Sequence, residues 1–165
     1  MSGAMREHFL ADPEATDALG RSLAATQPAR AVVYLHGDLG AGKSTLARAW
    51  LRALGVQGPV RSPTYTLVER YPLPQGEALH LDLYRIAGAG ELEFLGLDEI
   101  GVALWLVEWP ERGAGALPPA DLQVDLAVSG TGRAARLRPG SAAGQGWVKR
   151  MESFGDLRPL PESGR

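Results

Sequence analysis

Residues 37–45, "GDLGAGKST", combine three glycines, one lysine and two hydroxyls at the spacing of the phosphate-binding pattern G-x-x-x-x-G-K-[ST]. Glycines allow the backbone to fold back so that consecutive N–H groups point inward, and a following helix adds its positive N-terminal end. In this pattern Lys43 reaches the β- and γ-phosphates, and the Ser44 hydroxyl coordinates Mg²⁺. The stretch predicts a nucleotide site formed by Gly37, Asp38, Leu39, Gly40, Ala41, Gly42, Lys43, Ser44 and Thr45.

A phosphate-binding loop needs a carboxylate for the metal ion and for the attacking water, held at the end of a neighbouring strand. Glu108 ends the apolar stretch "LWLVE". Asp82 lies inside "HLDLYR", where a buried charge is unfavourable unless it is paired or faces a metal. Both acids are candidates for the metal site and, with Lys43, for catalysis. The alternative is that either acid simply ends a strand and bonds to an arginine or a loop amide.

The polar loop "RSPTYT" at 61–66 contains Thr64, a candidate switch residue that senses the γ-phosphate. A structural turn explains Thr64 nearly as well. His8, His36 and His80 lack the spacing of metal ligands. We therefore interpret the three histidines as structural residues.

The elements that must position these residues follow from alternating strand and helix patterns. Asp12 and Pro13 have the types of an N-cap and a first helical residue, and the apolar run at 102–109 is typical of a central strand. Together the patterns predict an α/β domain. The expected elements are a helix at 13–26, a strand at 31–36, a helix at 42–54, an antiparallel pair at 66–71 and 78–84, short acidic helical turns at 90–101, a strand at 102–109, and a closing pair at 121–128 and 134–138.

The chain has 165 residues, a formal net charge of -2 and no cysteine. Its length suits one domain, and its composition excludes disulfides and gives no overall attraction to nucleic acid or to anionic membranes. We expect a P-loop domain over residues 1–138 and a loose tail over residues 139–165, which are rich in glycine, proline and serine. Without a signal-peptide pattern or a long apolar run, we also expect no membrane contact and a cytoplasmic location.

Five segments, in matching order and spacing, resemble the TsaE family, formerly called YjeE: small bacterial P-loop ATPases required for the threonylcarbamoyl modification of tRNA adenosine 37. They are "GDLGAGKST", "VRSPTYTLVERY", "HLDLYR", "ELEFLGLDE" and "LVEWPER". The resemblance implies ATP and Mg²⁺ as ligands, TsaD and TsaB as partners, and a tRNA contact that is at most indirect. It also implies that Thr16, on the first helix, and Arg133, in "TGRAARL", lie near the base or the phosphates.

The resemblance further implies a single small P-loop NTPase-type domain of the α/β class, with a mixed sheet flanked by helices. It implies an ATP hydrolase, which we expect to be slow alone and stimulated by partners, because no arginine-bearing lid lies near the loop in the sequence. A P-loop small-molecule kinase and a non-hydrolysing nucleotide-dependent interaction module remain alternatives. The chain contains no asparagine, which argues against the Asn-Lys-x-Asp signature of GTP-binding switches.

Charge is unevenly distributed in the second half of the chain. Residues 91–111 hold six acids and no base, whereas residues 131–150 hold five bases and no acid. Each stretch is either a solvated face or a docking surface for a protein or, on the basic side, for tRNA phosphates.

Overall fold

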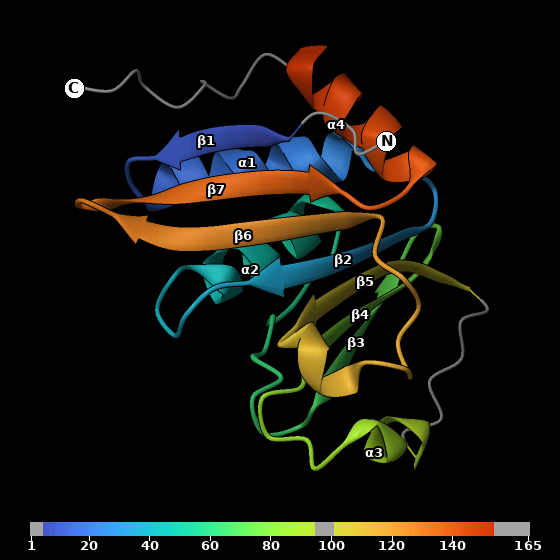
Figure 1. Cartoon of the computed structure of the whole chain (residues 1–165). Coiled ribbons are helices and arrows are strands. Elements are labelled where there is room, and N and C mark those ends of the chain that lie inside the picture. The colour runs from blue at the N-terminus through green and yellow to red at the C-terminus, as the bar shows by residue number, and fades with distance from the viewer. Residues whose placement is uncertain (1–4, 95–100, 154–165) are drawn as a thin grey trace.

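The computed structural model describes residues 5–94 and 101–153, which form a seven-stranded sheet with helices packed on it (Figure 1). The strand order is β1-β7-β6-β2-β5-β4-β3. The elements are β1 (Arg6–Leu10), α1 (Pro13–Thr26), β2 (Ala31–His36), α2 (Lys43–Ala53), β3 (Val68–Leu73), β4 (Gly76–Asp82), α3 (Ala89–Phe94), β5 (Val102–Glu108), the 3-10 helix η1 (Pro110–Gly113), β6 (Leu122–Ser129), β7 (Gly132–Pro139) and α4 (Ala142–Ser153).

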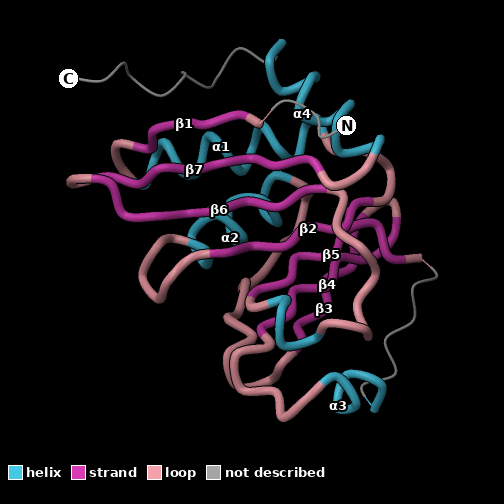
Figure 2. The backbone as a smooth tube through the Cα atoms, viewed as in Figure 1, coloured by secondary structure: helices cyan, strands magenta, loops and turns pink. Residues whose placement is uncertain are grey.

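The middle of the sheet is parallel and its two sides are antiparallel. β2 pairs in parallel with β5 and β6, and β4 pairs in parallel with β5. The β3–β4, β6–β7 and β1–β7 pairs are antiparallel. All seven residues of β5 are buried, as expected for a strand covered on both faces. The carboxyl ends of β2, β4 and β5 therefore meet at one edge, beyond which loops gather (Figure 2).

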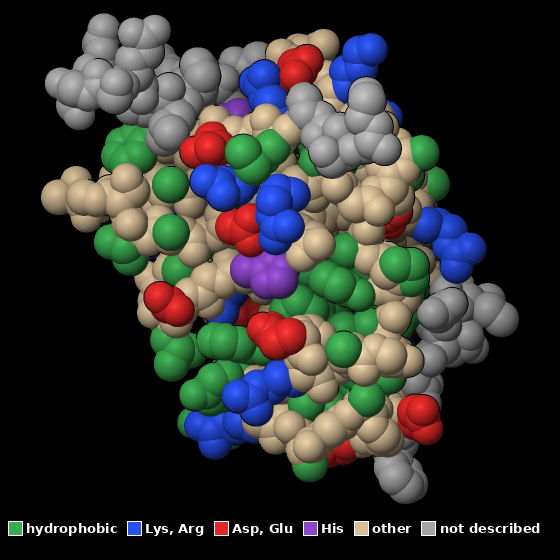
Figure 3. Space-filling model, viewed as in Figure 1, with side chains coloured by type: hydrophobic (Ala, Val, Ile, Leu, Met, Phe, Trp, Pro, Cys, Tyr) green, Lys and Arg blue, Asp and Glu red, His purple; other side chains and the backbone are tan. Residues whose placement is uncertain are grey.

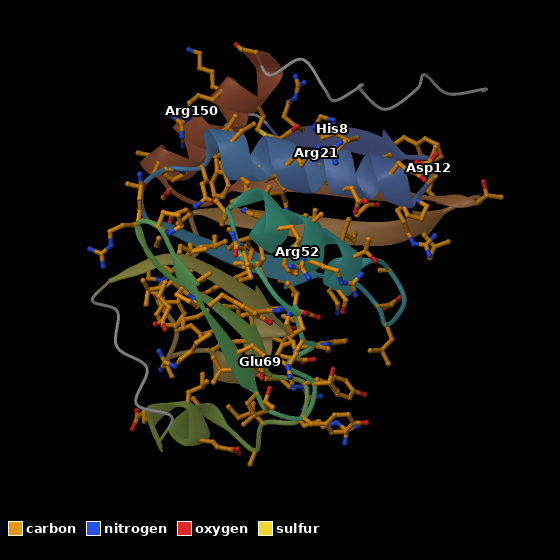
Figure 4. All side chains as sticks on the ribbon, turned by 180° about the vertical axis from the view of Figure 1, so that it is seen from behind. His8, Asp12, Arg21, Arg52, Glu69 and Arg150 are labelled. Carbon is orange, nitrogen blue, oxygen red and sulfur yellow. The ribbon has the colours of Figure 1, made fainter. Side chains whose placement is uncertain are left out.

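Helices α1 and α2 cover one face of the sheet and lie side by side (Figure 4). Asp12 caps α1 by accepting a hydrogen bond from the Ala15 amide at 2.9 Å, and Pro13 occupies the first turn. Figure 4 shows Asp12 at one end of α1 and Arg150 near the other. The helix thus runs between the loop edge of the sheet and the opposite end.

Apolar side chains pack on both faces of the sheet. The larger cluster, between the sheet and helices α1, α2 and α4, includes Trp50, Leu106 and Trp147. The smaller cluster lies on the other face of β4 and β5 and includes Leu81 and Trp105. Because both faces of these strands are covered, the sheet is a rigid base for the side chains at its carboxyl edge.

The elements expected within residues 13–94 and 101–138 are confirmed, with small shifts at their ends. The short strand β1 was not expected, and it adds an edge to the sheet by pairing with β7. Of the acidic helical turns expected at 90–101, the structure describes α3, while residues 95–100 lie outside the described residues.

The prediction of a loose tail after residue 138 is wrong for residues 139–153. β7 extends to Pro139, and α4 then docks on the domain with Trp147, Val148 and Met151 buried. The Trp147 ring meets the Trp50 ring edge-on, with 5.7 Å between the ring centroids. Residues 154–165 lie outside the described residues.

Asp121, just before β6, connects α4 to the sheet. Its carboxylate accepts hydrogen bonds from the Val32 amide at 2.9 Å and from the Ser141 hydroxyl at 2.7 Å. The Ser141 hydroxyl oxygen in turn accepts from the Gly144 amide at 3.0 Å, which caps the start of α4. A Cβ at Gly144 would overlap the Asp121 carbonyl oxygen, so glycine is required for this close approach.

Candidate nucleotide site

Residues 37–42 turn the chain from the end of β2 into the start of α2. Gly37 and Gly42 have φ of 151° and 108°, in the region that favours glycine. A Cβ at Gly37 would lie 2.6 Å from the Leu126 carbonyl oxygen, whereas the space around a Cβ at Gly42 is open. The backbone at the N-terminus of α2 is therefore one that an anionic ligand can approach closely.

Lys43 is the first residue of α2 and is buried. Its Nζ donates a hydrogen bond to the Gly37 carbonyl oxygen and lies 4.3 Å from the centroid of the Trp109 ring. An ammonium over an aromatic face is stabilised by the negative charge of that face. Trp109 directly follows Glu108 and has φ of 57°, a strained conformation for a bulky residue. The loop and the ring together hold the lysine at the loop edge of the sheet.

Asp82 and Glu108 end the neighbouring parallel strands β4 and β5, and the two residues are in register. Both side chains therefore point to the same side of the sheet. The two residues are 8% and 4% exposed. Asp82 accepts a hydrogen bond from the Tyr84 amide at 3.0 Å, and Glu108 Oε2 lies 2.7 Å from Nε2 of His80. A loop amide thus partners Asp82, and both acids lie at the edge where the phosphate loop begins.

One pocket of about 350 Å³ contains most of the predicted site. It brings together the phosphate loop, the loop that carries Thr64 and both strand-end carboxylates. The predicted residues that line it are Leu39, Gly40, Gly42, Lys43, Ser44, Thr45, Thr64, Asp82, Glu108 and Arg133. Gly37 and Asp38 line a separate small pocket with Lys43, and Ala41 is buried in the larger apolar cluster.

A second pocket of about 280 Å³ adjoins the first and shares Gly42, Thr45 and Arg133 with it. Thr16 of α1 lines this second pocket. Arg133 Nη2 donates a hydrogen bond to the Gly40 carbonyl oxygen at 3.1 Å, which connects β7 to the phosphate loop. The structure thus places Thr16 and Arg133 in one cavity beside the loop.

The loop at 61–66 is anchored at its start and reaches the main pocket through Thr64. The Tyr71 hydroxyl donates to the Arg61 carbonyl oxygen at 3.2 Å and accepts from the Arg61 amide at 2.9 Å. Burial raises the pKa of Tyr71, so the hydroxyl keeps the proton that it donates. The Thr64 hydroxyl lies 2.7 Å from that of Ser62. Thr64 therefore has a polar neighbour of its own and also borders the pocket.

Arg85 also lines the main pocket, although it is not among the site residues predicted from the sequence. Its guanidinium carbon lies 5.1 Å from the centroid of the Tyr65 ring, and Tyr65 belongs to the same loop as Thr64. An arginine from the segment after β4 therefore reaches the pocket, in addition to Arg133 of β7. The usable signal was its place three residues after Asp82, since strand ends line this edge of the sheet.

Among the described residues, no group of three or more His, Cys, Asp or Glu side chains forms a metal cage. A metal ion here would bind through few protein ligands, namely the Ser44 hydroxyl and the carboxylates of Asp82 and Glu108. Mg²⁺ suits such a site because it keeps several waters and takes further oxygens from phosphates. The donor set therefore fits Mg²⁺ that is bound together with a nucleotide.

The basic stretch at 131–150 is largely paired within the molecule. Arg136 and Arg138 form ion pairs with Glu7 and Asp125. The hydrogen bond to Asp125 raises the pKa of Arg138 further. Figure 3 shows Lys and Arg side chains next to Asp and Glu side chains on the visible face. This pairing favours a solvated face over a continuous surface for tRNA phosphates.

The family described as "Threonylcarbamoyl adenosine biosynthesis protein TsaE" has a sequence model that matches residues 10–136. The chain belongs to the TsaE family. The matched region contains every residue that lines the two adjoining pockets, and it ends before α4. The family resemblance expected from the five segments is thereby confirmed.

Relatives named "tRNA threonylcarbamoyladenosine biosynthesis protein TsaE" occur in several bacteria. The Haemophilus influenzae protein is 50% identical over 97 residues, which are 58% of this chain and 61% of that protein. The Aquifex aeolicus protein is 36% identical over 126 residues, 75% of this chain and 88% of that protein. The Streptomyces coelicolor protein is 38% identical over 136 residues, which are 79% of this chain and 92% of that protein. The chain therefore spans less than two thirds of the Haemophilus relative and most of the other two TsaE proteins.

The crystal structure of YdiB from Bacillus subtilis has the same fold as this TsaE-family chain, with a TM-score of 0.77 and 24% sequence identity. The match covers 93% of this chain and 97% of YdiB. It confirms the predicted fold, a single α/β domain with a mixed sheet flanked by helices. Within the described residues, every helix is too short or too polar to span a membrane.

Proposed function

We propose that this TsaE-family chain binds Mg²⁺-ATP in the main pocket and hydrolyses ATP in support of the complex that makes the threonylcarbamoyl modification on tRNA adenosine 37. The observation that carries the proposal is one pocket lined by Lys43, Ser44, Asp82 and Glu108. A lysine and a hydroxyl at a helix N-terminus, facing two strand-end carboxylates, are the groups that phosphoryl transfer to water requires. Because its pathway modifies tRNA, we place the protein in the cytoplasm.

For binding, the amides at the start of α2 and the Lys43 ammonium hold the phosphates. The second pocket adjoins the first at Gly42 and Thr45, so a nucleotide with its phosphates in the first pocket extends its base and sugar toward Thr16 and Arg133. This arrangement supports the binding roles that the family resemblance implies for both residues. The adjoining cavities are the reason for choosing a nucleotide over free phosphate.

For hydrolysis, bound Mg²⁺ supplies positive charge that neutralises the phosphate oxygens. Ser44, Asp82 and Glu108 are the residues that would hold the ion, and Glu108 would also orient the attacking water and accept its proton. Thr64 borders the same pocket and senses the γ-phosphate, while the Arg85 guanidinium stabilises the charge that develops on it.

TsaD and TsaB are the proposed partners. Around the pocket, Leu39 and Tyr65 are 75% and 83% exposed, although both are large and apolar in character. Exposed apolar groups at a pocket mouth support contact with another protein. Such contact would order the loop that carries Thr64 and Tyr65, and hydrolysis would rise when TsaD and TsaB bind.

Calorimetry with Mg²⁺-ATP, followed by steady-state ATPase assays with and without purified TsaD and TsaB, tests the proposal. We expect ATP binding by the chain alone, slow hydrolysis alone and faster hydrolysis with both partners. Binding without hydrolysis in either condition would favour the non-hydrolysing interaction module. Transfer of the γ-phosphate to a small molecule instead of water would favour the kinase. Absence of binding would contradict the nucleotide site itself.

A further inference from the structure

His80 lies on β4 two residues before Asp82, so both side chains project from the same face of that strand. On β5 the residue in register with His80 is Leu106, and Glu108 lies two residues further along. This diagonal arrangement brings His80 Nε2 within 2.7 Å of Glu108 Oε2. The two residues are 2% and 4% exposed. The contact is therefore a buried hydrogen bond to one of the two candidate catalytic acids.

The surroundings of the ring indicate which nitrogen carries the proton. A carboxylate accepts hydrogen bonds and cannot donate one, so the nitrogen that faces Glu108 must be the donor. The other ring nitrogen of His80, Nδ1, is buried and has no hydrogen-bond partner among the described residues. A proton on Nδ1 would be a buried donor without an acceptor, which is unfavourable. The arrangement thus favours a ring with its proton on Nε2.

Glu108 has no hydrogen-bond donor among its immediate neighbours in the sheet, because Asp82, in register with it on β4, is a carboxylate that only accepts and the other neighbours are apolar. Leu35 on β2 is in register with Glu108, and Leu106 precedes it on the same face of β5. Leucine side chains offer no hydrogen bond to orient a glutamate, which has several rotatable bonds. The contact with His80 occupies Oε2, and Glu108 also lines the main pocket. His80 therefore holds one oxygen of the Glu108 carboxylate, while the same carboxylate lines the nucleotide site.

We propose that His80 is a positioning residue for hydrolysis: it donates Nε2–H to Glu108 Oε2 and thereby fixes the carboxylate that acts on the attacking water. This inference rests on the proposed ATPase function. His80 acts through Glu108 and does not touch the nucleotide itself. Residues that orient a catalytic or metal-binding group in this way alter activity without contacting the substrate.

Two amide variants separate positioning from simple packing. The side-chain nitrogen of glutamine extends about as far from the backbone as Nε2 of histidine, whereas that of asparagine reaches only as far as Nδ1. Both variants remove the ring and its packing, but His80→Gln keeps a donor near Glu108. We expect His80→Asn to lower the ATP turnover number measured with TsaD and TsaB by about 10- to 100-fold. We expect His80→Gln to retain most of the turnover, and both variants to retain ATP affinity by calorimetry.

Equal loss in the two variants, or no loss in His80→Asn, would overturn the positioning role. A large loss of ATP affinity in His80→Asn alone would also overturn it, because it would place His80 in binding rather than in hydrolysis. Thermal unfolding of both variants controls for folding. If the wild-type protein fails to hydrolyse ATP with both partners, the proposed ATPase function is wrong. In that case an NMR measurement on the His80 ring tests the hydrogen bond to Glu108 by itself.

The ring measurement is a ¹⁵N NMR spectrum of the histidine side chains in the wild-type protein, with the His80 signals assigned by their loss in His80→Gln. We expect a protonated Nε2 and a bare Nδ1. A Nδ1-protonated ring would show that His80 does not donate to Glu108, and it would overturn the inference whatever the activity.

Discussion

The two ends of the central strands differ in what their residues do. At the carboxyl end of β2, β4 and β5, the chain places open glycine backbone, Lys43 and two carboxylates around a pocket of about 350 Å³. At the opposite end, the rings of Trp50 and Trp147 are fully buried against each other. There the Asp121 carboxylate accepts hydrogen bonds that connect β2 and the start of α4.

This difference indicates that binding and stability are separated along the strand direction. At the pocket end, polar groups such as Glu108 are buried, and their hydrogen-bonding capacity is not fully used within the described residues. Buried polar groups of this kind are typical of ligand-binding sites. Apolar groups at the other end fill the space between α1, α2 and α4. Substitutions at the two ends should therefore affect different measurements.

Truncation after Gly140 should have the largest effect, on stability. It removes α4 with the buried side chains of Trp147, Val148 and Met151. Each such side chain contributes about 1.5–3 kcal/mol, so the loss is roughly 5 kcal/mol. Since a domain of this kind has only about 5–15 kcal/mol in total, the melting temperature should fall by more than about 10 °C, or the chain should not fold.

Truncation after Ser153 is the matched control, because it removes none of the described contacts of α4. Thermal unfolding followed by circular dichroism compares the two truncations with the full chain. Similar melting temperatures for all three would show that the end opposite the pocket does not carry the stability assigned to it.

Lys43→Ala should have the next largest effect, on ATP affinity. Hydrogen bonds to charged groups contribute about 1.5–3 kcal/mol, so the dissociation constant for Mg²⁺-ATP should rise by roughly 10- to 100-fold. The control is Lys149→Ala, which replaces the second lysine of the chain at an exposed position of α4. Calorimetry on both variants measures the difference. Equal affinities in the two lysine variants would remove Lys43 from the phosphate site.

Arg133→Ala should have a smaller effect, also on ATP affinity. The variant loses the hydrogen bond to the Gly40 carbonyl oxygen and one wall shared by the two pockets. We expect affinity to fall by about fivefold, the effect of one ordinary hydrogen bond. Arg136→Ala, on the same strand but paired with Glu7, should bind ATP as wild type does. A fall of the same size in both arginine variants would indicate a general effect of charge rather than a role for Arg133.

The pocket end could be predicted from the sequence because its signals are local. The glycine spacing of the phosphate loop and the apolar strands ending in acids are visible over a few residues each. The contact between His80 and Glu108 could not be predicted, because it depends on the register between β4 and β5. These two strands pair in parallel, and neither strand's own sequence shows which of their residues lie opposite each other. Arg85 was missed although its place three residues after Asp82 was a usable local signal, because that signal does not show that the side chain reaches the pocket.

At the opposite end, the prediction of a loose tail was wrong because it rested on composition alone. The glycines and serines after residue 139 suggested a loose tail, yet Gly144 allows α4 to approach the Asp121 carbonyl and Ser141 caps the helix. The docked position of α4 is stabilised by the packing of Trp147 against Trp50, which lies almost a hundred residues earlier in the chain. No local pattern reports a contact of that range.

Single-turnover hydrolysis of Mg²⁺-ATP by Glu108→Gln, measured with TsaD and TsaB, is the decisive test of whether the pocket hydrolyses ATP through Glu108. Glutamine has the shape of glutamate, and its amide oxygen can still accept the hydrogen bond from His80, but it cannot accept a proton from water. We expect a rate lower than that of wild type by roughly 100-fold, with ATP affinity and melting temperature retained. A rate equal to that of wild type, with ATP binding confirmed, would contradict the claim that the pocket end of the sheet carries out hydrolysis through Glu108.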